Sequence, residues 1–242
     1  MKKLVGSICL FFIAATGFSQ KSYDDLRILY ADGNYEKLSK VADKYTNDDN
    51  TKKDVEPYLW LSKGLYKIHV GGNADPVFKN AYKESINALN KAIKMDKDGS
   101  VMSDVDNKEY WEMLQNSVVE QIDNDISTGN FRKAFGNVTS YKKLSKNLVG
   151  QIYLEGACKF RADDKSTGFT LWKTADDQLK KITTLDDWSP ADKEMLKMGA
   201  IQVAECYVSI KKVDVAKTML NKVAQWFEED EDFKEVYDKI VN

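Results

Sequence analysis

Apolar residues recur at helical spacing along most of the chain. Tyr35, Leu38, Ala42 and Tyr45 fall on one face of a helix, because residues three, four and seven positions apart lie on the same side. No stretch alternates polar and apolar residues for long enough to predict a strand. The pattern therefore predicts an all-α protein of about eleven helices, over residues 22–32, 35–47, 56–69, 76–96, 107–127, 131–145, 148–162, 168–184, 190–210, 213–227 and 231–241.

Capping residues and glycines mark the ends of these helices. Asp75-Pro76 and Ser189-Pro190 each place a capping side chain before a proline at the first helical position. Gly33 and Gly129 fall in turns, where glycine can adopt the left-handed backbone conformation. The connections are short apart from residues 97–106, so consecutive helices are expected to be antiparallel neighbours.

One sequence pattern occurs twice. Residues 31–45 read ADGNYEKLSKVADKY and residues 127–141 read STGNFRKAFGNVTSY. Both contain Gly-Asn-aromatic, a small or aliphatic residue three positions later, and a final tyrosine. Because a single helical hairpin cannot bury its apolar stripe alone, hairpins of similar sequence stack and recur with a fixed pattern. The sequence therefore predicts a repeat protein.

The pattern resembles the tetratricopeptide repeat (TPR). In the first, third and last hairpins it is carried by Leu26, Leu29, Gly33, Tyr35, Leu38, Ala42 and Tyr45, by Ile122, Gly129, Phe131, Ala134, Val138 and Tyr141, and by Ala204, Tyr207, Ala216, Leu220 and Val223. In the second and fourth it is carried by Tyr82, Ser85, Leu89 and Ala92, and by Ala157, Phe160, Trp172, Ala175, Leu179 and Ile182. The resemblance implies that residues 20–242 form a right-handed α-solenoid of about five degenerate TPR-like hairpins, with residues 231–241 as a capping helix.

The N-terminus, MKKLVGSICLFFIAATGFSQ, has the form of a cleavable signal peptide over residues 1–19. Two lysines precede an apolar run that is shorter than the roughly 20 residues a membrane span needs. We expect cleavage after Ser19, with cleavage after Gly17 as the second choice and a buried N-terminal helix as the alternative. Cys9 follows Ile8 rather than a small residue, so the protein is predicted to be periplasmic or secreted and not a lipoprotein.

Composition argues against several classes of partner and chemistry. Removing the signal peptide reduces the basic residues from 36 to 34 against 38 acidic ones, a net charge of −4. This balance gives no electrostatic reason to bind nucleic acid or insert into an anionic membrane. The two remaining cysteines, Cys158 and Cys206, fall on predicted helices among apolar residues. We expect buried free thiols, although a secreted protein could also pair them in a disulfide.

No catalytic constellation emerges from the sequence. The only histidine, His69, ends a predicted helix, where it interacts favourably with the helix dipole. The aspartates around residues 97–106 do not match the spacing of an EF-hand, which leaves weak calcium binding as an alternative. We therefore expect a non-enzymatic protein without a metal or other cofactor.

Partner binding is the function that the resemblance implies, because TPR proteins bind ligands on the concave face formed by the first helix of each hairpin. The resemblance places seven side chains near that face: Tyr23, Arg27, Tyr30, Lys63, Tyr66, Arg161 and Glu205. The expected partner is a protein or peptide of the cell envelope. One alternative is a glycan-capture protein that uses groove aromatics as stacking platforms. Another is an outer-membrane assembly or secretion accessory component, against which the missing lipid-attachment cysteine argues.

Overall fold

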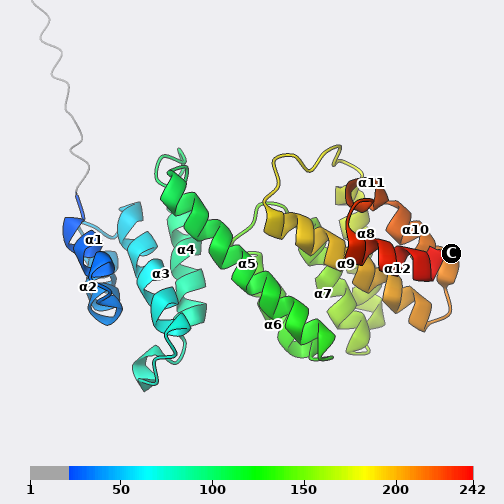
Figure 1. Cartoon of the computed structure of the whole chain (residues 1–242), viewed down its shortest axis with the longest axis horizontal. Helices are drawn as coiled ribbons and strands as arrows, with labels where there is room; N and C mark the ends of the chain where they lie inside the picture. Colours follow the sequence, from blue (N-terminus) through cyan, green and yellow to red (C-terminus); the bar gives the residue numbers. More distant parts are fainter. Residues whose placement is uncertain (1–21, 242) are drawn as a thin grey trace, which may run out of the picture.

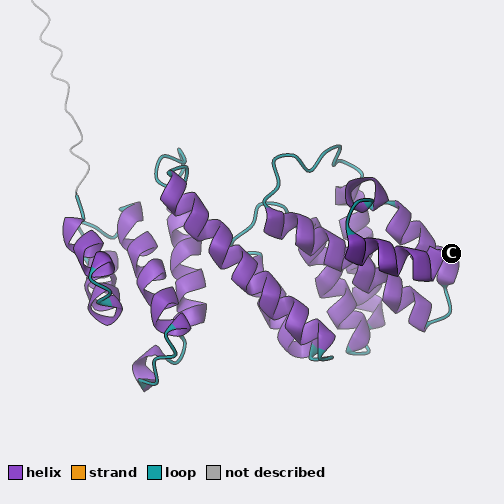
Figure 2. Ribbon diagram, viewed as in Figure 1, coloured by secondary structure: helices purple, strands orange, loops and turns teal. Residues whose placement is uncertain are grey.

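The computed structural model describes residues 22–241, and this part of the chain contains helices and loops but no strand (Figure 2). The predicted signal peptide lies outside the described residues. The described elements are α1 (Asp24–Ala31), α2 (Tyr35–Asn47), α3 (Val55–Val70), the 3-10 helix η1 (Pro76–Phe78), α4 (Ala81–Met95), α5 (Val105–Ser127), α6 (Phe131–Tyr141), α7 (Val149–Arg161), α8 (Lys165–Leu179), α9 (Pro190–Ser209), α10 (Val213–Asn221), α11 (Ala224–Phe227) and α12 (Glu231–Val241). The all-α prediction is confirmed.

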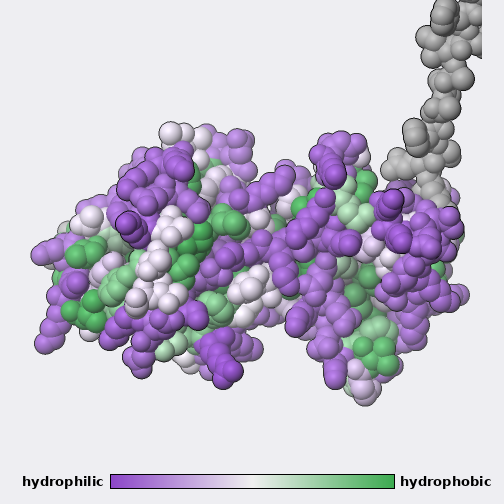
Figure 3. All heavy atoms as spheres, turned by 180° about the vertical axis from the view of Figure 1, so that it is seen from behind, coloured by the Kyte–Doolittle hydropathy of each residue, from purple (hydrophilic) through white to green (hydrophobic). Residues whose placement is uncertain are grey.

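The helices follow one another along an elongated molecule, from α1 and α2 at one end to α10 and α12 at the other (Figure 1). Helix α3 lies against both α2 and α4, and α7 lies against both α8 and α9. The 23-residue helix α5 connects the two halves of the molecule. Successive apolar clusters, rather than one central core, are buried along this row of helices. Seen from the opposite side, hydrophobic surface shows in patches between hydrophilic side chains (Figure 3).

Each of the odd-numbered helices from α1 to α9 ends in a turn of the same type. One residue of each turn has a positive φ angle: Gly33 (71°), Gly72 (66°), Gly129 (75°), Asp163 (65°) and Lys211 (61°). The next N–H donates to a carbonyl five residues back, as in Asn34 to Leu29 (2.9 Å) and Lys212 to Tyr207 (2.9 Å). This is the Schellman arrangement. The left-handed conformation predicted for Gly33 and Gly129 is confirmed, and the same geometry recurs without glycine in the last two turns.

The helix predicted over residues 76–96 is interrupted. Asp75 accepts a hydrogen bond from the Val77 N–H (2.9 Å) and thereby starts the short helix η1. Phe78 is buried against α3 and Ala81. The chain then bends before α4 begins at Ala81, because burying Phe78 at this point uses a tighter turn than a continuous α-helix provides.

Three other predicted helices have different ends. Residues 131–145 form a helix only as far as Tyr141, because the Leu144 carbonyl instead accepts hydrogen bonds from Trp111 and Gln115 (2.7 and 2.9 Å). Helix α8 begins at Lys165, earlier than predicted, because Asp164 caps it through the Thr167 N–H. Residues 213–227 divide into α10 and α11.

Aspartates organise the long connection between α4 and α5. The Asp96 carboxylate accepts hydrogen bonds from the Val101 and Met102 N–H groups (3.2 and 2.7 Å). Asp104 caps α5 by accepting from Asp106 and Asn107 (3.1 and 3.3 Å). These carboxylates therefore hold the backbone of the turn. Among residues 22–241 there is no group of three or more side chains suited to hold a metal ion.

The two cysteines of the described chain are buried free thiols, as predicted. Burial raises the pKa of Cys158 to about 12 and that of Cys206 to about 11. Because the thiolate is the reactive form of cysteine, both groups are poorly reactive at neutral pH while the protein is folded.

Candidate functional site

The seven predicted surface residues belong to odd-numbered helices or their ends, but they do not form one site. Arg27 and Lys63 line one cavity, formed by α1, α3 and the start of α5. Arg161 and Glu205 line a second cavity, next to α7 and α9. Tyr23, Tyr30 and Tyr66 line neither of these two cavities. The seven predicted residues therefore fall into two separate pairs and three tyrosines outside both cavities.

Tyr23 was wrongly predicted to lie on the binding surface. Its side chain is 2% exposed, and its ring meets the edge of the Tyr45 ring at 5.1 Å between centroids. The Tyr23 hydroxyl donates to Asp54 Oδ2 (2.5 Å). The residue thus belongs to the core at the start of α1, where it ties the first hairpin to the segment that leads into α3.

The first cavity, which we call the α3 cavity, has a volume of about 450 Å³. It is lined by Arg27, Glu56, Leu59, Trp60, Lys63, Ser100, Val101, Asp104, Asp106 and Asn107. Its volume lies within the usual range for small-molecule or side-chain binding pockets. The wall combines one indole ring with cationic, anionic and amide side chains, so it can both accept and donate hydrogen bonds.

Lys63 is the most constrained charged group of this cavity. The residue is 7% exposed, and its Nζ lies over the rings of Trp60 and Tyr110, at 4.8 and 5.6 Å from their centroids. Nζ donates to Asn107 Oδ1 (2.7 Å). No carboxylate of the described chain lies within 4.0 Å of it. Burial lowers the pKa of Lys63, and the more distant charges of Asp106 and Asp104 oppose that effect.

An ammonium group carries three N–H donors, and Asn107 takes only one of those of Lys63. Two donors of a buried cation are therefore left without a protein acceptor in the described chain. Arg27 is also available, since its side chain is 60% exposed and its one carboxylate neighbour, Glu56, is 3.8 Å away. The cavity can therefore supply cationic donors to the acceptor atoms of a ligand.

Tyr30 and Tyr66 form an aromatic layer behind the α3 cavity. Tyr30 is half-buried, with its ring 5.6 Å from Tyr35 and 5.5 Å from Trp60. Tyr66 is also half-buried, 6.2 Å from the ring of Tyr110. Both tyrosines therefore pack against the aromatic rings that surround the Lys63 ammonium, and both remain partly exposed.

Arg161 and Glu205 meet directly at the second cavity, whose volume is about 470 Å³. Arg161 Nη2 donates to Glu205 Oε2 and to Gln202 Oε1, both at 2.8 Å. The guanidinium lies 4.5 Å from the centroid of the Phe131 ring. Glu205 and Gln202 thus engage Nη2 of this guanidinium, whereas its buried Nε has no hydrogen-bond partner in the described chain.

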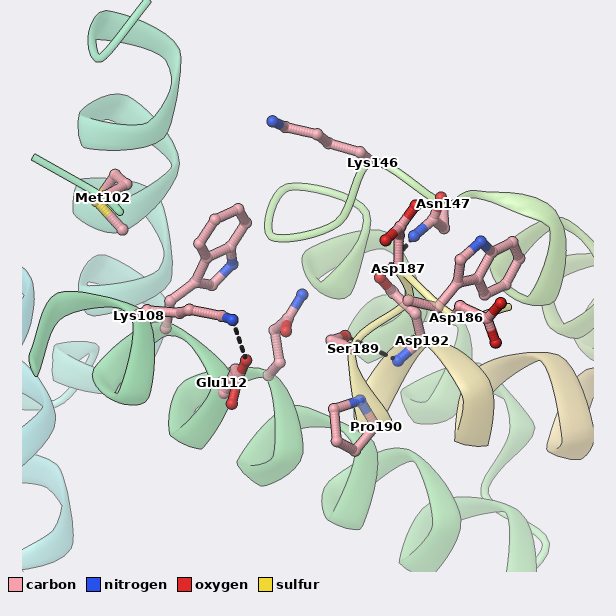
Figure 4. A pocket seen from close by; sticks show the side chains of 13 residues that line it. Met102, Lys108, Glu112, Lys146, Asn147, Asp186, Asp187, Ser189, Pro190 and Asp192 are labelled. Carbon is pink, nitrogen blue, oxygen red and sulfur yellow. Dashed lines mark hydrogen bonds and ion pairs between the residues drawn. The ribbon is translucent and has the colours of Figure 1, made fainter. Parts of the chain in front are cut away.

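A third cavity, which we call the α5–α9 cleft, contains none of the predicted residues. Its volume is about 480 Å³, and α5, the links before α7 and α9, and the start of α9 surround it (Figure 4). Trp111 and Trp188 both line it. Trp111 packs against the apolar cluster that contains Leu114, and Trp188 packs against the C-terminal cluster that contains Leu196. The sequence signal for this cleft is a tryptophan inside the polar stretch Asp186-Asp187-Trp188-Ser189, because binding residues are disproportionately found on the loops between helices.

Comparison with known protein families, with curated proteins and with solved structures finds no match. None of the helices among residues 22–241 combines the length and the apolar character that crossing a bilayer requires.

Proposed function

We propose that this protein is a secreted or periplasmic, non-enzymatic scaffold that binds a protein or peptide partner at the α3 cavity. In this proposal the chain is a TPR-like right-handed solenoid of five hairpins, α1–α2 to α9–α10, with α12 as its cap. The signal-type N-terminus supports secretion. The Schellman turn shared by five helices supports the repeat.

The observation that carries the proposal is the incompletely paired ammonium of Lys63. Burying a cation is unfavourable unless it is paired and hydrogen-bonded. The chain nevertheless places Lys63 in the wall of a cavity with one neutral acceptor and two aromatic rings. A purely structural position would be better filled by an apolar side chain of the same length. A ligand that brings acceptor oxygens would complete the hydrogen bonding of the ammonium.

A peptide segment suits the mixed character of this cavity. Backbone carbonyls or a carboxylate can accept from Lys63 and Arg27, and backbone N–H groups can donate to Glu56 and Asp106. Trp60 supplies an aromatic wall of the kind that concentrates binding energy in protein interfaces. Glu56, Asp104 and Asp106 would repel a polyanion, so the cavity favours a peptide over nucleic acid.

Replacing Lys63 by methionine tests the proposal. Methionine has a similar length and removes the buried charge, so we expect the melting temperature to stay the same or rise. Binding of the partner, measured by quantitative mass spectrometry after capture from cross-linked envelope fractions, should weaken by about 2 kcal/mol, as at an interface hot spot. Lys67→Met, on the same helix but outside the cavity, is the matched control and should leave capture unchanged.

Two results would contradict the proposal. Equal capture by the Lys63→Met and Lys67→Met proteins would remove Lys63 from any binding site. A melting temperature that falls sharply in Lys63→Met alone would assign the lysine a structural role instead.

A further inference from the structure

The α5–α9 cleft combines rigid aromatic walls with a dense set of polar groups, and we propose that it binds an uncharged oligosaccharide. This site is separate from the α3 cavity, so the inference goes beyond the partner-binding function. The cleft runs between α5, which carries Lys108 and Glu112, and the segment that carries Asp186 and Asp187, with Lys146 at the edge (Figure 4).

The two tryptophans supply the apolar surface of the cleft. Trp111 Nε1 donates to the Leu144 carbonyl (2.7 Å), which fixes the plane of its ring. Trp188 is half-buried against the C-terminal core, and its ring nitrogen has no hydrogen-bond partner in the described chain. A sugar ring presents a face of C–H groups edged by hydroxyls. An indole offers such a ligand a flat apolar face and, in Trp188, a free donor.

The remaining lining is polar and mixed in charge. Six of the thirteen lining residues are charged: Lys108, Glu112, Lys146, Asp186, Asp187 and Asp192. Two lysines and four carboxylates line the cleft, and this excess of negative charge disfavours an anionic ligand. Hydroxyl groups both donate and accept, so a neutral sugar can satisfy every part of this lining.

The wall on the α9 side is held in place by hydrogen bonds within the chain. The buried Asp192 carboxylate accepts hydrogen bonds from Tyr141 (2.9 Å), Ser145 (2.5 Å) and Asn147 (3.1 Å). Ser189 caps α9 by accepting from the Asp192 N–H (3.1 Å). Asp186 and Asp187, in contrast, form no ion pair within the described residues. The network around Asp192 thus fixes the start of α9, directly after the link that carries these free acceptors, and a preformed wall lowers the entropic cost of binding a ligand.

Titration calorimetry with the purified chain tests this inference, using maltohexaose, cellohexaose and hexa-N-acetylchitohexaose as uncharged probes. We expect saturable binding of at least one of them. Trp111→Ala and Trp188→Ala should each weaken that binding by about tenfold or more. Trp226→Ala removes an indole outside the cleft and should leave it unchanged. Retained helical circular dichroism shows that each variant is folded. Indole N–H shifts of Trp111 and Trp188 in the unmodified protein provide a readout that needs no variant.

The inference is overturned if none of the three sugars binds saturably. It is also overturned if binding occurs but neither tryptophan signal shifts and neither cleft variant changes the affinity. Hexalysine serves as the charged comparison, and binding of hexalysine without any sugar would make the cleft a site for basic peptides. The Lys63→Met protein should bind sugar normally, so failure of this inference is separable from failure of the partner-binding proposal.

Discussion

Replacing Gly150 by alanine should destabilise the protein by roughly 3 kcal/mol, because helices α7 and α9 touch at this residue. A Cβ atom at Gly150 would lie 2.4 Å from the carbonyl carbon of Met195 and 2.5 Å from the Leu196 nitrogen. These are backbone atoms, so no side chain can rotate away to make room. For a chain of this size, such a loss corresponds to a fall of about 6–12 °C in melting temperature.

Gly136→Ala is the matched control for this substitution. Gly136 lies within α6, and no atom lies within 4 Å of the position its Cβ would take. Alanine should therefore stabilise the helix by about 0.5–1 kcal/mol, since glycine loses more backbone entropy on folding. Thermal melts of both variants measure the contrast. Equal melting temperatures for the two would contradict the close contact between α7 and α9.

Raising the pH above 10 should unfold the protein cooperatively. Tyr141 and Tyr153 are both 0% exposed and donate to carboxylates of Asp192 and Asp176 (2.9 and 2.6 Å). Burial first, and then the carboxylate, raises the pKa of both tyrosines well above its usual range. Burial also raises the pKa of Tyr82 to about 12.

Stability falls at alkaline pH because the folded protein holds the protons of its buried tyrosines more tightly than the unfolded chain does. A tyrosine whose pKa is raised in the folded state contributes stability that is fully present below the unfolded value, about 10, and is lost as the pH rises through the folded value. An alkaline titration that follows tyrosinate absorbance and far-ultraviolet circular dichroism should therefore show the buried tyrosines ionising together with the loss of helix. In Tyr153→Phe the loss of helix should depend less steeply on pH, because one fewer proton is released. Ionisation of all twelve tyrosines near pH 10 with the helices intact would contradict this account.

Much of the fold could be predicted because it depends on local sequence. Helical spacing of apolar residues located nearly every helix, and Asp75 and Ser189, the two capping residues predicted from the sequence, both cap helices with their own side chains. Errors arose where tertiary contacts override this local preference. Burial of Phe78 breaks one predicted helix, and the hydrogen bonds that Leu144 accepts shorten another.

The candidate sites could be predicted only in part. The repeat resemblance placed Arg27 and Lys63 on one face, and the structure brings both to one cavity. Tyr23 was misplaced because the residue before a helix can turn its side chain either into the core or away from it. Trp111 and Trp188 are distant in sequence and line the same cleft only because α5 lies against α9. No local pattern encodes that crossing.

Photo-cross-linking at Arg27 tests the central claim most directly. A benzoylphenylalanine at this exposed position lies in the wall of the α3 cavity, and the same group at Lys217, on α10, serves as the control. In intact cells that make the protein, the Arg27 probe should yield one discrete cross-linked protein or peptide. That product should disappear when Lys63→Met is added, and the Lys217 probe should not form it. A product at Arg27 that persists when Lys63→Met is added, or formation of the same product at both positions whatever residue occupies position 63, would contradict a partner-binding role for the α3 cavity.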